Sequence, residues 1–225
     1  MLQMKKTVLL SVLMLLATLV NAQEAKTFFV NMPDSLSPML SANNRADCVD
    51  FLESNMKAEV TNRFGSKTEL THMTKDYIRL QLTPQSDWQM KVLPLSNGGS
   101  VLCAVFTSCA PVCDSRVEFY DANWNLLESH HYLVLPELTD FIVIPDAGED
   151  REKVIDASRD ADILLMKADV SDTEPAVIFT FTTPEYLDKE TADRLEAFIR
   201  PSMVYYWKDD NKFIPGDLIE AGVDE

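Results

Sequence analysis

The residues of this chain best suited to chemistry are its four cysteines, and two of them, Cys109 and Cys113, stand on either side of Ala-Pro-Val. Two thiols this close could bind a metal, carry redox chemistry or close a loop. A redox pair needs CxxC spacing beside the start of a helix, whereas this is CxxxC in a predicted turn. A structural zinc site needs two further ligands, and the sequence offers no second pair nearby. We therefore predict a disulfide between Cys109 and Cys113 that shapes a turn.

The remaining thiols and imidazoles form no recognisable catalytic pattern. Cys48 and Cys103 are predicted to be small buried residues, with a second disulfide between them as the alternative. The histidines number three, and no nucleophile signature accompanies them. His130 and His131 are adjacent in ESHHYLVL, so on a strand their side chains would point to opposite faces and could not share a metal ion. We expect no catalytic residue, no metal ligand and no cofactor.

Acidic and amide side chains gather at residues 121–125, DANWN, which match the first three alternating ligands of a calcium-binding loop. The match then fails, because Leu126 stands where glycine is needed and Tyr132 where the bidentate glutamate should be. A polar hairpin tip explains this segment. Asp169 and Asp172 would act as general acid and base only if a cleft brought two carboxylates face to face.

Aromatic side chains supply the candidate interaction surface. Trp124 lies at a predicted turn, and Tyr205 and Trp207 lie on the last predicted strand, where they could offer flat platforms to a sugar or a protein. Packing in the core and against neighbouring strands is the alternative for such a row. Trp124 is the strongest candidate of the three, because a hairpin tip has little core to enter.

The elements that would position these residues are mostly strands. Apolar and polar residues alternate over 78–82, 88–92 and 117–119, and 101–106 is apolar on both faces, which predicts an antiparallel meander. A helix with a cap at Asn43, over residues 43–56, would lie across one face. The pattern further predicts strands at 141–144, 163–170, 176–182 and 203–207 and helices at 149–158 and 188–199. Residues 28–30 are expected to form only a short apolar lead.

Two segments, 115–127 and 202–214, can be laid over each other without a gap, and each resembles a hairpin with an Asp- and Asn-rich tip. This similarity predicts two related halves, although hairpins resemble one another without shared origin. We therefore expect an α+β fold, mainly antiparallel β-sheet in a meander with two or three packed helices. Its N-terminal α+β half would be residues 23–145 and its C-terminal α+β half residues 146–225, which could pack as one domain.

Residues 1–22 have the pattern of a signal peptide. Lys5 and Lys6 precede an apolar run, and small side chains at Val20 and Ala22 suit a cleavage site after Ala22. The run is shorter than the roughly 20 residues of a spanning helix. A lipid anchor would need a cysteine just after the cut, and the first is Cys48. We expect an exported protein, periplasmic or extracellular, that is not a lipoprotein and has no transmembrane segment after cleavage.

The charge excludes one class of partner. The whole chain carries 20 basic and 36 acidic side chains, a formal charge of −16, and removal of two lysines with the signal peptide would make it −18. A field of this sign repels phosphate backbones, and no basic cluster reverses it locally. We expect no nucleic-acid partner.

Five strings of the chain, MPDSL (32–36), NNRADCVDF (43–51), MKAEVTNRFG (56–65), CAPVC (109–113) and YLDKETADRL (186–195), resemble the Domain of Unknown Function 3256 family. This is an uncharacterised family of exported proteins from Bacteroidales. The resemblance implies an envelope or extracellular site in a Gram-negative anaerobe, and it implies no activity, substrate or catalytic residue.

The function predicted from these observations is a non-catalytic binding or interaction module of the cell envelope, because no set of polar residues converges along the sequence. Its partner would be an envelope or extracellular protein or a glycan. The alternative is a hydrolase of envelope or dietary polymers that uses carboxylates such as Asp169 or Asp172. A purely structural envelope component is a third hypothesis.

Overall fold

The computed structural model describes residues 24–161 and 163–216. Its first elements are two helices, α2 (Ala25–Asn31) and α3 (Ala42–Glu53). Helix α3 begins one residue before the predicted Asn43, because Ser41 is the cap. The Ser41 Oγ accepts a hydrogen bond from the Asn44 backbone amide at 3.2 Å, and the Ser41 backbone amide donates to the Asn44 Oδ1. The segment predicted as a short apolar lead is part of helix α2, which buries Phe28 and Phe29.

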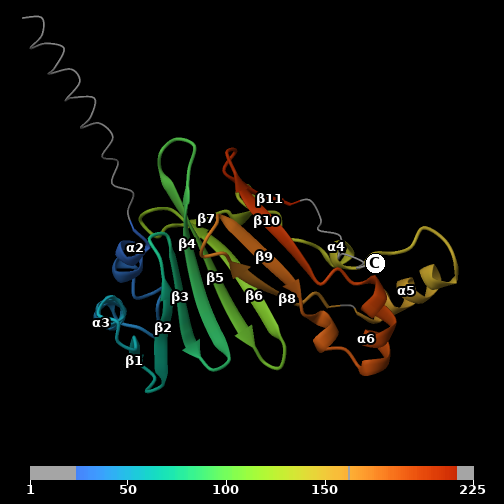
Figure 1. Ribbon diagram of the computed structural model, residues 1–225, viewed down its shortest axis with the longest axis horizontal. Coiled ribbons are helices and arrows are strands. Elements are labelled where there is room, and N and C mark those ends of the chain that lie inside the picture. Colours follow the sequence, from blue (N-terminus) through green and yellow to red (C-terminus); the bar gives the residue numbers. More distant parts are fainter. Residues whose placement is uncertain (1–23, 162, 217–225) are drawn as a thin grey trace, which may run out of the picture.

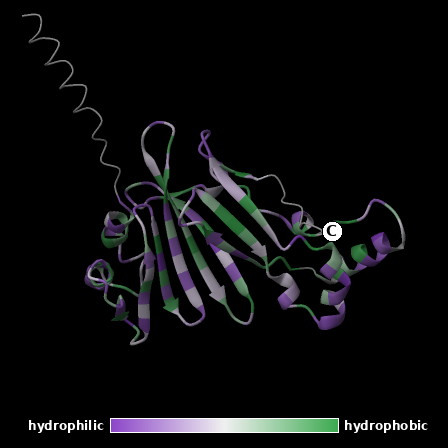
Figure 2. Ribbon diagram, viewed as in Figure 1, coloured by the Kyte–Doolittle hydropathy of each residue, from purple (hydrophilic) through white to green (hydrophobic). Residues whose placement is uncertain are grey.

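The larger sheet is the predicted antiparallel meander, with seven strands in chain order. The alternating runs around residues 80, 90, 103 and 118 all form strands in it, which confirms the prediction for this part of the chain. The strands are β1 (Glu59–Thr61), β2 (Lys67–Met73), β3 (Tyr77–Thr83), β4 (Ser86–Pro94), β5 (Ser100–Cys109), β6 (Cys113–Tyr120) and β7 (Leu126–Leu127). Figure 2 shows hydrophobic and hydrophilic residues alternating along the strands of this sheet.

The smaller sheet has four antiparallel strands in the order β11-β10-β9-β8, so strand β8 is one of its edges. These strands are β8 (Met166–Val170), β9 (Ala176–Phe181), β10 (Ser202–Lys208) and β11 (Lys212–Pro215). The connecting helices are α4 (Leu138–Phe141), α5 (Glu149–Asp160) and α6 (Lys189–Leu195), together with the short 3-10 turns η1 (Ser129–His131), η2 (Thr183–Glu185) and η3 (Glu196–Phe198). The α+β prediction with a mainly antiparallel sheet is therefore confirmed.

One predicted strand is wrong. Residues 138–141 form helix α4, and Ile142 contributes only an isolated bridge to Ile199. The capping pair Glu137 and Asp140 starts a helical turn here, which the apolar composition of residues 141–144 does not indicate.

The larger sheet separates two hydrophobic cores, one on each face. Helices α2 and α3 lie on one side of it and the smaller sheet with α5 and α6 lies on the other (Figure 1). The sheet–helix core contains Phe28, Phe29, Cys48, Leu70, Ile78, Leu80, Met90, Leu102, Ala104, Tyr120 and Trp124. The sheet–sheet core contains Val101, Cys103, Val105, Val117, Phe119, Ala168, Val177, Phe179, Tyr205, Trp207 and Phe213. None of the helices in residues 24–161 and 163–216 is long and apolar enough to cross a membrane.

The cysteines fulfil their predicted roles. Cys109 and Cys113 form a disulfide with an S–S distance of 2.02 Å at the turn between β5 and β6. Cys48 on helix α3 and Cys103 on β5 are free and buried, and they belong to the two cores on opposite sides of the larger sheet. Burial raises the pKa of Cys48 to about 11 and that of Cys103 to about 12, so both thiols are protonated at neutral pH.

The two segments predicted to be similar hairpins share a backbone feature. Trp124 and Asn211 occupy equivalent positions in the gapless overlay, and both have a positive φ, 65° and 63°. The amide of each donates to the carbonyl three residues earlier, that of Asp121 at 3.0 Å and that of Lys208 at 2.9 Å. The hairpin prediction is confirmed for β6–β7 and β10–β11. The division of the whole chain into two related halves stays a prediction.

Candidate functional site

The floor of the candidate site is set by the register of three neighbouring strands. Trp88 on β4 is paired with Phe106 on β5, and Phe106 is paired with Arg116 on β6. Two residues further along these strands, Ala104 on β5 pairs with Glu118 on β6. Because alternate residues of a strand share a face, all five side chains lie on the face that carries helices α2 and α3.

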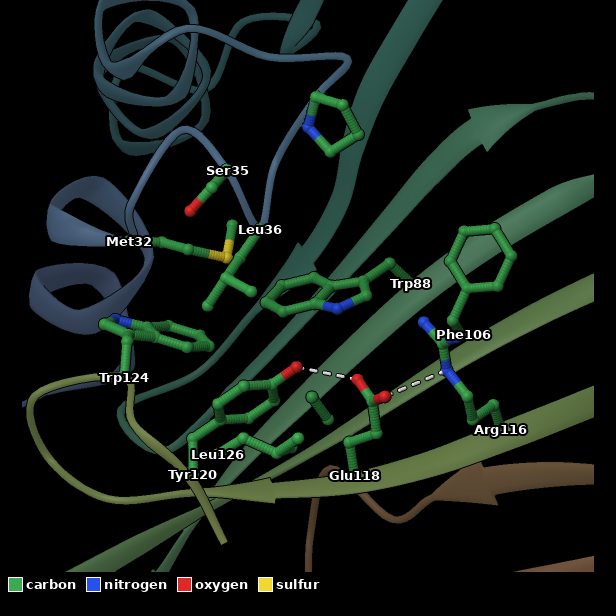
Figure 3. Close-up of a pocket in the computed structure, with 12 residues that line it drawn as sticks. Met32, Ser35, Leu36, Trp88, Phe106, Arg116, Glu118, Tyr120, Trp124 and Leu126 are labelled. Atoms are coloured by element: carbon green, nitrogen blue, oxygen red, sulfur yellow. Dashed lines mark hydrogen bonds and ion pairs between the residues drawn. The ribbon is translucent and has the colours of Figure 1, made fainter.

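A groove of about 410 Å³ opens where the helical layer ends on this face. Its floor is the row just described, and its wall is the segment after helix α2 together with Trp124 from the β6–β7 hairpin (Figure 3). The lining residues are Met32, Ser35, Leu36, Pro38, Trp88, Ala104, Phe106, Arg116, Glu118, Tyr120, Trp124 and Leu126.

The polar part of the groove is a chain of three side chains on β6. The Arg116 Nε lies 3.1 Å from one oxygen of Glu118, and the Tyr120 hydroxyl donates to the other at 2.6 Å (Figure 3). Burial raises the pKa of Tyr120, and the hydrogen bond to Glu118 raises it further, so the phenol is a donor at neutral pH. Glu118 is thus held in one orientation, with a guanidinium beside it that is mostly exposed to solvent.

The aromatic part of the groove is a series of rings that support one another. Trp88 stacks on Phe29 with centroids 6.0 Å apart and lies 6.5 Å from Trp124, which in turn lies 5.3 Å from Tyr120. Phe106 is 39% exposed at the open end, opposite Arg116. A ligand in this groove therefore meets fixed aromatic side chains on one part of its surface and charged groups on another.

The wall of the groove is fixed from behind by Arg45 on helix α3. Its guanidinium donates to the carbonyls of Leu40 at 2.8 Å and Val30 at 3.3 Å, and to that of Met32. It also pairs with Asp34 at 3.2 Å. These bonds satisfy backbone acceptors of the segment that carries Met32, Ser35 and Leu36, so the wall is ordered without help from a ligand.

Comparison with known proteins gives a family for this chain. The model of the family described as "Protein of unknown function (DUF3256)" matches residues 17–213. The chain belongs to the DUF3256 family. A search of curated proteins gives no match.

A solved structure shares the fold of this DUF3256 protein. It is a domain of an uncharacterized protein from Porphyromonas gingivalis W83, with a TM-score of 0.72 and 23% sequence identity, over 87% of this chain and 98% of that one. At this identity the likeness shows the fold alone. All residues that line the groove lie inside the part of the chain that the family matches.

The sequence-predicted aromatic residues of the DUF3256 protein do not come together. Trp124 belongs to the sheet–helix core, whereas Tyr205 and Trp207 belong to the sheet–sheet core on the other side of the larger sheet. Trp124 is only 8% exposed and its Nε1 donates to the Phe28 carbonyl at 3.1 Å, so the expectation that a tip residue has little core to enter is wrong. One side of Trp124 still lines the groove.

Tyr205 and Trp207 pack in the core and against neighbouring strands, which was the alternative to an exposed binding platform. Tyr205 meets Phe179 edge to face at 5.4 Å, and the Trp207 Nε1 donates to the Pro94 carbonyl at 2.8 Å. Both side chains are buried. In this structure they offer no open platform.

The carboxylates of the hydrolase hypothesis lie outside the groove. Asp169 is held between the two sheets by Lys167 at 2.5 Å and by Gln89 at 3.1 Å. Asp172 pairs with the Nε2 of His72 at 3.0 Å. Asp121, the first residue of the calcium-like DANWN segment, accepts hydrogen bonds from the Asn123 and Asn125 amides, as a polar hairpin tip does.

The strand geometry expected for His130 and His131 is wrong. His130 and His131 do not lie on a strand but on the 3-10 turn η1, with their ring centroids only 4.1 Å apart. The reason that adjacent histidines could not share a metal ion therefore does not apply to this pair.

The groove residues Trp88, Phe106, Arg116 and Glu118 were not singled out from the sequence. A signal for them exists in the predicted disulfide. If Cys109 and Cys113 face each other, residues equally far from the turn are also partners, which places Phe106 opposite Arg116 and Ala104 opposite Glu118.

Proposed function

We propose that this DUF3256 protein is an exported, non-catalytic binding module of the cell envelope and that its groove binds a neutral glycan. The observation that carries the proposal is the row of Trp88, Phe106 and Arg116 across three strands, with Glu118 fixed beside it. Export rests on the signal-peptide pattern of residues 1–22, which lie outside the described residues.

The chemistry of the groove suits a sugar chain. The apolar face of a pyranose ring packs on an aromatic side chain, while its hydroxyls accept from guanidinium N–H groups and donate to a carboxylate. Phe106 and Trp88 supply the first kind of contact, and Arg116 and Glu118 supply the second. The acidic charge of the whole chain disfavours polyanionic glycans, which is why the proposal names a neutral one.

Glycoside hydrolysis receives no comparable support. Most glycosidases use two carboxyl groups about 5–10 Å apart on either side of the bond that breaks. Glu118 is the only acidic residue among those that line the groove, and it is bound by Arg116 and Tyr120. The groove thus has the composition of a binding site rather than of a hydrolytic one.

The test is a titration with cellohexaose, maltohexaose, xylohexaose and mannohexaose, followed by tryptophan fluorescence. The Trp207→Phe variant keeps two of the three tryptophans of the chain, Trp88 and Trp124, and both of these line the groove. We expect at least one of these sugars to shift their emission in a saturable way. Phe106→Ala and Arg116→Ala should each weaken that binding by roughly tenfold, the effect of losing about 1.4 kcal/mol of contact.

The matched control is Phe64→Ala. Phe64 is 70% exposed on the turn between β1 and β2 and does not line the groove, so this variant should bind like the parent protein. A panel in which no hexasaccharide changes the emission, or in which Phe64→Ala and Phe106→Ala weaken binding equally, would overturn the proposal.

A further inference from the structure

Three metal-ligating side chains, none of which lines the groove, meet at the surface around turn η1. The Nε2 atoms of His130 and His131 lie 3.6 Å and 4.0 Å from the same carboxylate oxygen of Glu128. All three donor groups lie within 4.8 Å of one another. Within the part of the chain that the structure describes, this is the one such group of three histidine, cysteine or acidic side chains.

The backbone beneath these side chains is fixed by its neighbours. Tyr132, the next residue, stacks between Phe119 at 5.1 Å and Trp207 at 6.2 Å, and its carbonyl accepts from the Phe213 amide at 2.7 Å. Leu133 follows and is buried in the sheet–sheet core. The turn is therefore anchored, while the side chains of Glu128, His130 and His131 are exposed to solvent.

Two imidazoles and a carboxylate are the ligand set that zinc and related divalent transition ions prefer, whereas calcium and magnesium prefer oxygen ligands alone. Zinc bonds of about 2.0–2.1 Å in a tetrahedron place ligand atoms roughly 3.3–3.5 Å apart. The two histidine–glutamate separations are 3.6 Å and 4.0 Å and all three ligand atoms lie within 4.8 Å of one another, so each pair must close by about 1.5 Å at most to reach that spacing.

We propose that Glu128, His130 and His131 bind one divalent transition-metal ion of the zinc class. Three protein ligands leave a fourth tetrahedral position for water or for a donor from a binding partner. The acidic charge of the whole chain favours the approach of a cation to this surface.

The experiment uses untagged protein, because an oligohistidine tag would itself bind the ion, and measures zinc binding by isothermal titration calorimetry. We expect one zinc ion per chain. His130→Ala and His131→Ala each remove one of three protein ligands and should each lower the affinity by roughly tenfold or more. Glu128→Gln replaces an anionic ligand with a neutral amide oxygen and should also weaken binding. All three side chains are exposed, so the variants should fold like the parent protein.

The control is His72→Ala. His72 is the remaining histidine and also lies beside a carboxylate, that of Asp172, but it offers a two-ligand pair. This variant should bind zinc like the parent protein. A loss of binding in His72→Ala that equals the loss in His131→Ala, or the absence of saturable binding by the parent protein, would overturn the proposal.

A spectroscopic readout identifies the ligands independently. Copper(II) occupies similar nitrogen and oxygen sites, and its electron paramagnetic resonance spectrum reports the bound nitrogens. We expect a signal from two imidazole nitrogens in the parent protein and from one in His130→Ala. An unchanged spectrum in both histidine variants of the turn would place the ion elsewhere.

Discussion

At the scale of single residues, Arg45 shows how a buried charge can order a site whose lining it does not join. Its side chain is 1% exposed, and its hydrogen bonds go to the backbone on either side of the segment that walls the groove. Burial lowers the pKa of Arg45, and the hydrogen bond that its guanidinium donates to Asp34 opposes this. A guanidinium suits the position because its fixed fork of donors reaches several carbonyls at once.

We predict that Arg45→Ala destabilises the protein by about 3 kcal/mol, because it leaves several buried carbonyls without a donor. Arg63→Ala is the matched control, since Arg63 also pairs with Asp34 but is largely exposed, and it should change little. Urea unfolding of the two variants measures the difference. Equal midpoints for both would show that the buried contacts of Arg45 do not order the wall.

At the scale of elements, strand β8 is an edge whose outward amides are capped by side chains from the larger sheet. The amides of Met166, Ala168 and Val170 donate to Asp114 at 3.3 Å, to Ser115 at 2.9 Å and to Gln89 at 3.0 Å. An open edge would invite pairing with another chain. These hydrogen bonds give the three outward amides of β8 a partner, and they fix the position of the smaller sheet on the larger one.

We predict that Gln89→Ala lowers stability by roughly 2–3 kcal/mol and speeds hydrogen exchange at the Val170 amide. Gln89 is fully buried, and it joins the Val170 amide, the Tyr77 hydroxyl and Asp169. Gln81→Ala on the neighbouring strand is the control, since its side chain is exposed and should matter little. Unchanged exchange at Val170 in Gln89→Ala would contradict the capping role.

At the scale of the whole molecule, the larger sheet is a shared layer between two cores. Its two faces pack against different partners, so neither the helices nor the smaller sheet can leave without exposing apolar side chains. Phe119 on the larger sheet and Phe179 on the smaller sheet both lie in the sheet–sheet core. Exposing either side chain to water would cost roughly 1.5–3 kcal/mol. Such losses are large beside the total stability of about 5–15 kcal/mol that is usual for a domain.

We therefore predict one cooperative unfolding transition for both sheets. Tryptophan emission reports the sheet–helix core in Trp207→Phe, which keeps Trp88 and Trp124, and the sheet–sheet core in the double variant Trp88→Phe, Trp124→Phe, which keeps Trp207. In each variant the fluorescence midpoint should coincide with the midpoint from far-ultraviolet circular dichroism. Separate midpoints would show that the predicted halves unfold as independent units.

What the sequence by itself determined is local. Alternation of polar and apolar residues set the strands of the meander, and the spacing of Cys109 and Cys113 around a proline set the disulfide turn. The position of that turn also fixes the pairing register of β5 and β6, because residues that pair across a hairpin are equally far from its tip. Side-chain period and turn chemistry act over a few residues, so a single sequence is enough to read them.

Only the tertiary structure decided which side chains are covered. Trp124 turns from a hairpin tip into the core because helix α2 supplies a carbonyl partner 96 residues earlier in the chain. Trp88 and Phe106 border a groove because the helical layer covers Trp88 only in part, through Phe29, and leaves Phe106 exposed. His130 and His131 share one side of a turn because Tyr132 is held between the two sheets. Each outcome depends on contacts between segments far apart in the chain, which local periodicity does not contain.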